Sequence, residues 1–265
     1  MSEKTRQHEL EIEMNAPAER VWQALSTAEG IASWFAPVAR VEPGVGGSVF
    51  ARWGDACEGS SRIEAWEPGR HMRLANDRAE GAPPSVVDYF LEGKGGATVL
   101  RLVHSGFGPE SSFDGEFESS GAAWPAFLKM MKHSVERGAL WCRNATVFRV
   151  LDCPPEKCWE TLMGPRGLAA AEALAHAAPG APLGVRDASG EPLHALLRYS
   201  GKGVCCLEFP GRRDAMLTVF CENAAGKAML TVTWLLYDAE KGAAETVGER
   251  WGSFVDGLFA RRAAA

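Results

Sequence analysis

The sequence lacks an excess of basic residues. Its 265 residues include 28 lysines and arginines against 34 acidic residues, which leaves a net charge of −6. Binding to nucleic-acid phosphates or anionic lipid head groups relies on clustered positive charge. We therefore expect neither nucleic acid nor a membrane among the partners of this protein.

Long apolar runs are also missing. The N-terminal residues carry charges where a secretory signal would need an apolar segment. The most apolar stretch, residues 167–185, is interrupted by Glu172, His176 and several glycines and prolines. A bilayer span needs about 18 uninterrupted apolar residues. We expect a cytoplasmic protein without a transmembrane helix.

Familiar catalytic and metal-binding motifs are absent as well. The seven cysteines include no C-x-x-C pair, so neither a zinc site nor a redox couple is indicated. The sequence has no G-x-S-x-G, H-E-x-x-H, phosphate-binding loop or strand-linked G-x-G-x-x-G pattern. It therefore predicts no metal site and does not indicate a conventional enzyme.

A catalytic alternative rests on polar residues in predicted strands. His71 and His104 would suit acid/base chemistry, and two of Glu58, Glu64 and Asp88 could pair across a sheet. Structural histidines, and carboxylates on a solvated outer face, explain the same residues more simply.

What the sequence does contain is an internal repeat. Segments 17–25 and 154–162 share proline, glutamate, tryptophan and leucine at the same positions, and Gly30 and Gly167 follow at the same spacing. Near the end of each half, a second motif aligns Trp124, Phe127, Leu128 and Met131 with Trp251, Phe254, Val255 and Leu258. The repeat predicts two domains, residues 1–138 and 144–265, joined by a short linker near 138–143.

Each half shows the same succession of elements. A strand at 9–14 or 146–151 precedes a short helix that starts near Pro17 or Pro154. Turn residues then divide the chain into strand-length pieces. These are 48–53, 61–66, 71–75, 86–91 and 97–104 in the first half, and 192–199, 204–209, 215–222 and 227–237 in the second. A longer helix closes each half, at about 117–137 and 243–262.

This order predicts an α+β fold with two domains, each a curved antiparallel sheet wrapped around a long C-terminal helix. Such a sheet tends to leave space beneath the helix, and that space is the expected ligand site.

Four motifs in the first half resemble a known family. They are Ala-Pro-Ala-Glu-Arg-Val-Trp-Gln-Ala-Leu at 16–25, Trp34-Phe35, Gly46-Gly47 and Gly-Ala-Thr-Val-Leu-Arg-Leu-Val-His-Ser-Gly-Phe at 96–107. Together they are similar to bacterial members of the activator of heat-shock protein 90 ATPase branch of the SRPBCC (START-like) superfamily, over residues 8–138. The second half resembles a diverged copy, with alanines in place of Trp34-Phe35 and with Trp234 at the position of His104.

The resemblance implies a helix-grip fold with a deep apolar pocket and no obligatory cofactor. Its known roles range from binding hydrophobic ligands to co-chaperone action and polyketide cyclisation. Because the second half lost the Trp-Phe pair, we expect the first domain to carry the working cavity. The candidate ligand-binding residues are Trp34, Phe35, Trp53, Trp66, Tyr89, His104, Phe107, Trp124, Phe127 and Met131. Ordinary core packing is the alternative role of each aromatic residue.

Alternation along 97–104 orients this site. Thr98, Leu100, Leu102 and His104 share one face of a strand, and Arg101 lies on the other. Since arginine prefers solvent, the leucine face should turn toward the helix, and His104 should offer one polar handle to an apolar ligand held against Trp124 and Phe127.

Three functions remain open at this point. The leading hypothesis is non-catalytic binding of a hydrophobic small molecule. The second is a co-chaperone or adaptor that binds a chaperone or another protein through its surface. The third is a cyclase/aromatase-like or hydrolase-like enzyme, which would need polar side chains converging in the cavity near Arg101 or His104.

Overall fold

The chain consists of two compact units, residues 1–141 and 142–265. The structure is a computed structural model that describes residues 6–55, 57–78, 82–138, 142–237, 240 and 242–260. The two units are treated below as the first and the second domain. Much of the linker expected near 138–143 lies outside the described residues.

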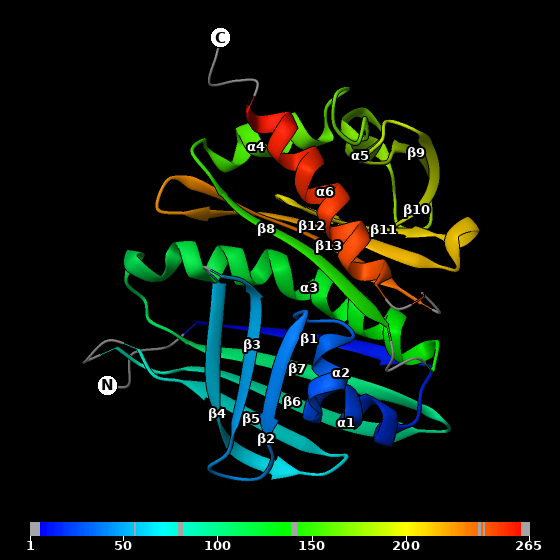
Figure 1. The fold of residues 1–265 in the computed structure, drawn as a ribbon. Helices are drawn as coiled ribbons and strands as arrows, with labels where there is room; N and C mark the ends of the chain where they lie inside the picture. Colours follow the sequence, from blue (N-terminus) through cyan, green and yellow to red (C-terminus); the bar gives the residue numbers. More distant parts are fainter. Residues whose placement is uncertain are drawn as a thin grey trace. The chain divides into compact units, whose positions relative to one another are not determined.

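The first domain is a seven-stranded antiparallel sheet with a long helix on its concave face (Figure 1). The strand order is β1-β7-β6-β5-β4-β3-β2. The strands are β1 (Arg6–Met14), β2 (Val38–Glu42), β3 (Ser48–Gly54), β4 (Cys57–Glu67), β5 (His71–Asn76), β6 (Ser85–Lys94) and β7 (Ala97–Phe107). The helices are α1 (Ala18–Ser26), α2 (Ala28–Ala32), the 3₁₀ turn η1 (Ser111–Phe113) and the long α3 (Asp114–Glu136).

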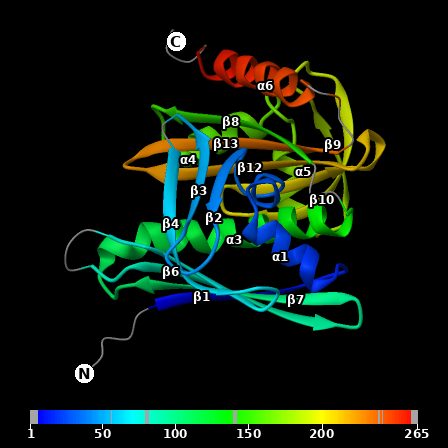
Figure 2. The same cartoon turned by 60° about the horizontal axis from the view of Figure 1, so that its bottom comes forward.

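The second domain repeats this plan with one strand fewer (Figure 2). Its order is β8-β13-β12-β11-β10-β9. The strands are β8 (Arg143–Leu151), β9 (Pro182–Arg186), β10 (Pro192–Gly201), β11 (Val204–Phe209), β12 (Ala215–Ala224) and β13 (Lys227–Leu236). The helices are α4 (Pro155–Met163), α5 (Ala171–His176), the 3₁₀ turn η2 (Pro210–Arg212) and α6 (Ala243–Ala260).

The α+β class and the tandem helix-grip plan are confirmed. The first strand, both closing helices and every predicted central strand are present. Two strands were not predicted, β2 and β9, and both are five-residue strands at the edge of their sheet. Strand β2 has no fully buried residue, so its apolar alternation is weak. Strand β9 buries Leu183 and Val185 in alternation, but its Pro182 and Gly184 are typical of a turn in the sequence.

The repeated glycine has the same structural reason in both domains. A Cβ atom at Gly30 would lie 2.0 Å from the Gln23 carbonyl oxygen, and one at Gly167 would lie 1.9 Å from the Leu162 carbonyl oxygen. Each glycine therefore lets the chain turn back closely onto the first helix of its domain. Pro17 and Pro154 precede these helices as N-cap residues.

No helix within the described ranges is both long enough and apolar enough to cross a membrane. The same ranges hold no group of three histidine, cysteine or carboxylate side chains placed to bind a metal ion.

Candidate ligand-binding site in the first domain

Strand β7 forms the floor beneath α3. Thr98, Leu100, Leu102 and His104 are all buried, whereas Arg101 and the other alternate residues of the strand are half-buried. This is the alternation that the sequence predicts, and it directs His104 toward α3. Glu9 on β1 pairs with the outward-facing Arg101, at 3.2 Å between Oε1 and Nη1.

His104 is held by two hydrogen bonds. The indole Nε1–H of Trp124 on α3 donates to its Nδ1 at 2.9 Å, and its Nε2 lies 2.8 Å from the Ser85 hydroxyl on β6. Burial, together with the charges of His8 and Arg78, lowers the pKa of His104 from 6.5 to about 4. The imidazole is therefore neutral at physiological pH.

The direction of these bonds follows from their donors. An indole N–H can only donate, so Nδ1 of His104 must be the acceptor. A neutral imidazole then carries its proton on Nε2, and this N–H donates to the Ser85 oxygen. His104 consequently cannot take a proton from Ser85 in this arrangement. The pair lacks the geometry of an activated serine nucleophile.

Eight of the ten predicted ligand-binding residues form one connected aromatic group. Trp124 is at its centre, with ring centroids 6.3 Å from Phe35, 6.3 Å from Tyr89 and 6.0 Å from Phe127. The other members join through these rings or through His104: Trp34, Trp53, Phe107 and His104 itself. Residues from the turn after α2, from three strands and from α3 are thus brought together.

The two remaining predicted residues lie apart from this group of rings. Trp66 packs edge-on against Trp22 of α1 at 5.0 Å and contacts the small core cluster around Ile63. Met131 is fully buried on α3. Their positions indicate core packing rather than direct access to a ligand.

Part of the aromatic group is incompletely covered. Trp34 and Trp124 are buried, but Phe35, Trp53 and Phe127 are only half-buried although they contact one another. These three rings form an apolar margin where α2, β3 and α3 meet.

A row of inward-facing residues crosses the sheet beside His104. Val87 of β6 lies opposite His104, Leu74 of β5 opposite Val87, and Ile63 of β4 opposite Leu74. Ile63 is fully buried, but Val87 and Leu74 are only half-buried in the middle of the sheet. The concave face of the first domain therefore keeps accessible apolar surface next to a polar group. The sequence motifs did not reveal this row, because it depends on strand register.

The equivalent row in the second domain is closed. Trp234 takes the place of His104, and Leu217, Leu207 and Leu197 continue the row, each in register with its neighbour. All four residues are buried. Trp234 stacks on Phe209 at 5.0 Å and contacts Trp251 at 5.6 Å.

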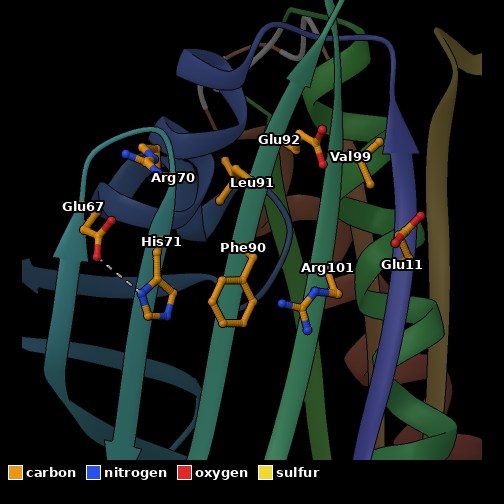
Figure 3. A pocket seen from close by; sticks show the side chains of 9 residues that line it. All are labelled: Glu11, Glu67, Arg70, His71, Phe90, Leu91, Glu92, Val99 and Arg101. Atoms are coloured by element: carbon orange, nitrogen blue, oxygen red, sulfur yellow. Dashed lines mark ion pairs between the residues drawn. The ribbon is translucent and has the colours of Figure 1, made fainter.

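A groove of about 450 Å³ lies on the opposite, outer face of the first sheet (Figure 3). Glu11, Arg101, Phe90, His71 and Glu67 lie opposite one another on five adjacent strands. The Phe90 ring stands between the His71 imidazole, stacked at 4.4 Å, and the Arg101 guanidinium, 4.3 Å from the ring centroid. The rest of the lining is Arg70, Leu91, Glu92 and Val99.

The three carboxylates of the catalytic hypothesis lie on this outer face. Glu58 and Glu64 are exposed, as a solvated face predicts, but Asp88 is buried. Asp88 bonds His71 Nε2 at 2.8 Å, and Arg73 lies between Asp88 and Glu64, at 4.0 and 3.4 Å. With an arginine between them, these carboxylates do not form an acid/base pair, and none faces the concave side.

None of the ten predicted residues lines this groove or the two grooves found in the second domain. The larger of those two, about 550 Å³, lies where β8, α4 and α6 meet, and charged side chains such as Asp152, Lys157 and Asp256 line it. This groove is on the surface and does not test which domain carries the working cavity. The placement of that cavity in the first domain stays a prediction.

Comparison with known proteins relates the first domain to one family. Residues 15–136 match the family model of Activator of Hsp90 ATPase homolog 1-like protein. A search of curated proteins found no match.

Solved structures with similar chains include three of interest. A protein from Mesorhizobium loti is 24% identical with a TM-score of 0.44, and the alignment covers 50% of this chain and 98% of that one. The Aha1 dimer from Colwellia psychrerythraea is 21% identical with a TM-score of 0.42, covering 50% and 98%. The di-domain ARO/CYC BexL from the BE-7585A biosynthetic pathway is 14% identical with a TM-score of 0.45, covering 98% and 95%.

Proposed function

We propose that this chain, whose first domain matches the Activator of Hsp90 ATPase homolog 1-like family, binds an apolar small molecule on the concave face of that domain without transforming it. The observation that carries the proposal is the half-open row beside His104. Val87 and Leu74 face inward from central strands yet remain accessible, and accessible apolar surface on a concave face favours ligand binding.

Two further features support binding rather than catalysis. The rings of Phe35, Trp53 and Phe127 offer apolar contact at the margin of the same face. The nearby polar pair, His104 and Ser85, has its shared proton on the imidazole, which removes the general base that a serine nucleophile needs. Burial against the rings should supply most of the binding energy, with His104 contributing little.

The proposal sets a scale for affinity. A ligand of about 25 non-hydrogen atoms at roughly −0.3 kcal/mol per atom would bind with about −7.5 kcal/mol, which corresponds to a dissociation constant in the low micromolar range.

The decisive experiment is a fluorescence titration with the uncharged probe N-phenyl-1-naphthylamine. The repeat supplies a matched pair of variants, because Phe127 on α3 corresponds to Phe254 on α6 and both are half-buried. Phe127→Ala should weaken binding by about tenfold, the value of a lost aromatic contact of about 1.5 kcal/mol. Phe254→Ala should leave it unchanged. If the probe binds saturably and Phe254→Ala weakens binding while Phe127→Ala does not, the binding site lies in the second domain.

A second candidate function is recognition of a partner protein on the outer groove. The supporting observation is the row from Glu11 to Glu67, in which charged side chains stand on both sides of the stacked Phe90 and His71 rings. Charged rows of this kind favour specific protein contacts over burial of an apolar ligand. A pulldown with the parent chain and an Arg70→Glu variant would test it. If Phe127→Ala abolishes capture of the partner protein and Arg70→Glu does not, the outer groove is not the binding surface.

A further inference from the structure

Ser85 lies beside the half-open row, in the next inward-facing pair of residues along β6 and β5. It lies two residues before Val87 on β6, so both side chains face α3, and its exposed fraction is only 8%. Its partner across the sheet is Asn76, the last residue of β5, which is exposed. Ser85 is therefore a buried hydroxyl directly opposite an exposed residue at the end of β5.

The backbone around Ser85 is held in place. Gly106 of β7 adopts a φ of 93°, and a Cβ atom there would lie 1.9 Å from the Pro84 carbonyl oxygen. Only glycine permits this close approach of β7 to the start of β6. The position of the Ser85 hydroxyl is thus fixed by both neighbouring strands.

The Ser85 hydroxyl has an unused donor. Trp124 donates to Nδ1 of His104, so the Nε2–H of His104 donates to the Ser85 oxygen. A hydroxyl that accepts one hydrogen bond still has its own proton to donate. Within the described ranges, the Ser85 oxygen makes its only hydrogen bond with His104, so this proton has no protein acceptor.

The nearby guanidinium of Arg78 already has protein partners. Arg78 donates to the Gly106 carbonyl at 2.5 Å and pairs with Glu116. Since Arg78 is already paired, it offers no free charge to an anionic ligand group, and burying such a group unpaired would be costly. An uncharged oxygen would satisfy the Ser85 proton without that cost.

We infer that Ser85 is the specificity-determining hydrogen-bond donor of the apolar site, and that the ligand carries an uncharged acceptor, a carbonyl or ether oxygen, at one end of an apolar body. The inference rests on the proposed function and adds the ligand's chemical class. The second domain lacks the donor, because Ala215 stands at the equivalent position two residues before Leu217 on β12.

The test compares two probes of the same shape, 2-acetylnaphthalene and 2-isopropenylnaphthalene, which differ by a carbonyl oxygen in place of a methylene group. Competition against N-phenyl-1-naphthylamine gives the affinity of each for the full chain. The parent should prefer the acetyl probe by about two- to tenfold, the range of one net hydrogen bond.

Variants of Ser85 then locate the preference. Ser85→Thr retains the hydroxyl and should keep it, whereas Ser85→Val, which is isosteric with the threonine variant, and the smaller Ser85→Ala should bind both probes equally. A preference that persists in Ser85→Val overturns the inference and leaves the proposed function standing. If the parent binds neither probe nor N-phenyl-1-naphthylamine, the proposed function fails and the inference fails with it.

A ligand-free measurement checks the proton assignment separately. Two-bond ¹⁵N–¹H correlation spectra distinguish the two imidazole tautomers of His104. The proton should be on Nε2 in the parent. A proton on Nδ1 would free the Ser85 hydroxyl to donate to His104 and would overturn the inference whatever the probes do.

Discussion

The two domains share one fold and differ in how the concave face is filled. In the first domain the row beside His104 is half-open, and Ser85 and Asn76 form the adjacent inward-facing pair. In the second domain Trp234, Ala215 and Phe209 occupy the corresponding places, and the row is buried throughout. Large apolar side chains complete one core, whereas smaller and polar ones leave room in the other.

The comparison also concerns hydrogen bonding. In the first domain the two imidazole nitrogens of His104 and the indole N–H of Trp124 all have partners, and the Ser85 proton is left for a ligand. In the second, Nε1 of Trp234 is buried and, among the described residues, has no hydrogen-bond partner. In the second domain, Trp234 fills the core but leaves its buried N–H donor without a hydrogen bond to any described residue. Four predictions test this contrast, from the largest expected effect to the smallest.

Acidification should weaken the first domain and spare the equivalent site in the second. The pKa of His104 is about 4 in the folded domain and 6.5 when unfolded, so its contribution is complete above pH 6.5. Below that pH the unfolded chain takes up a proton that the folded domain refuses until about pH 4. The loss should reach about 3 kcal/mol.

Urea unfolding at several pH values measures this loss, with the indole N–H signals of Trp124 and Trp251 reporting on each domain. A His104→Gln variant should be less stable at neutral pH but should lack the step between pH 6.5 and 4. Parallel pH profiles for parent and variant would show that another group causes the loss.

The same truncation should have unequal costs in the two domains. Trp124→Phe removes the donor to His104 Nδ1 and leaves a buried acceptor unpaired, which should cost about 1–3 kcal/mol beyond the lost ring volume. Trp234→Phe removes an N–H that has no hydrogen-bond partner in the described part of the chain, so only the volume loss remains. Urea unfolding midpoints of the two variants provide the comparison, and equal costs would contradict it.

Enlarging one residue in each row tests the difference in space directly. Leu217→Phe must fit into a fully buried row and should cost about 1–3 kcal/mol through overpacking. Val87→Phe enters the half-open row and should cost less than about 1 kcal/mol while it blocks the probe. Thermal unfolding together with N-phenyl-1-naphthylamine titration measures both effects. A Val87→Phe variant that binds the probe normally would place the site elsewhere.

The smallest effect is expected on the outer face. Arg101→Gln removes the contact with Phe90 and the ion pair with Glu9, both at a residue that solvent reaches. Such interactions contribute about 0.5–1 kcal/mol. Probe affinity should not change, because Arg101 points away from α3. A large loss of affinity in this variant would mean that the two faces of the sheet communicate.

The sequence predicted the fold well because the repeat fixes it twice. Pro17 and Pro154, the two glycines and the two closing-helix motifs mark the same elements in both halves. It missed β2, which has no fully buried residue, and β9, whose proline and glycine are typical of a turn. Alternation along β7 also placed His104 and Arg101 on the correct faces.

The site was accessible to sequence reasoning only in part. Large aromatic residues identified the group around Trp124, since such residues are rare and must pack somewhere. The row through Val87 and Leu74, the bond between Ser85 and His104, and the outer groove all depend on which strands pair and in which register. Residues far apart in the chain become neighbours only when the sheet forms, and a local sequence pattern does not predict which of them will pair.

What the sequence determined by itself is therefore the kind of fold, its duplication and the inward direction of His104, because periodicity and turn residues act over a few positions. The tertiary structure decided which domain keeps an open concave face, which hydroxyl has a proton to donate and which carboxylate is buried. Those properties arise from packing and hydrogen-bond geometry, in which a single substitution such as tryptophan for His104 changes the environment of every residue in its row.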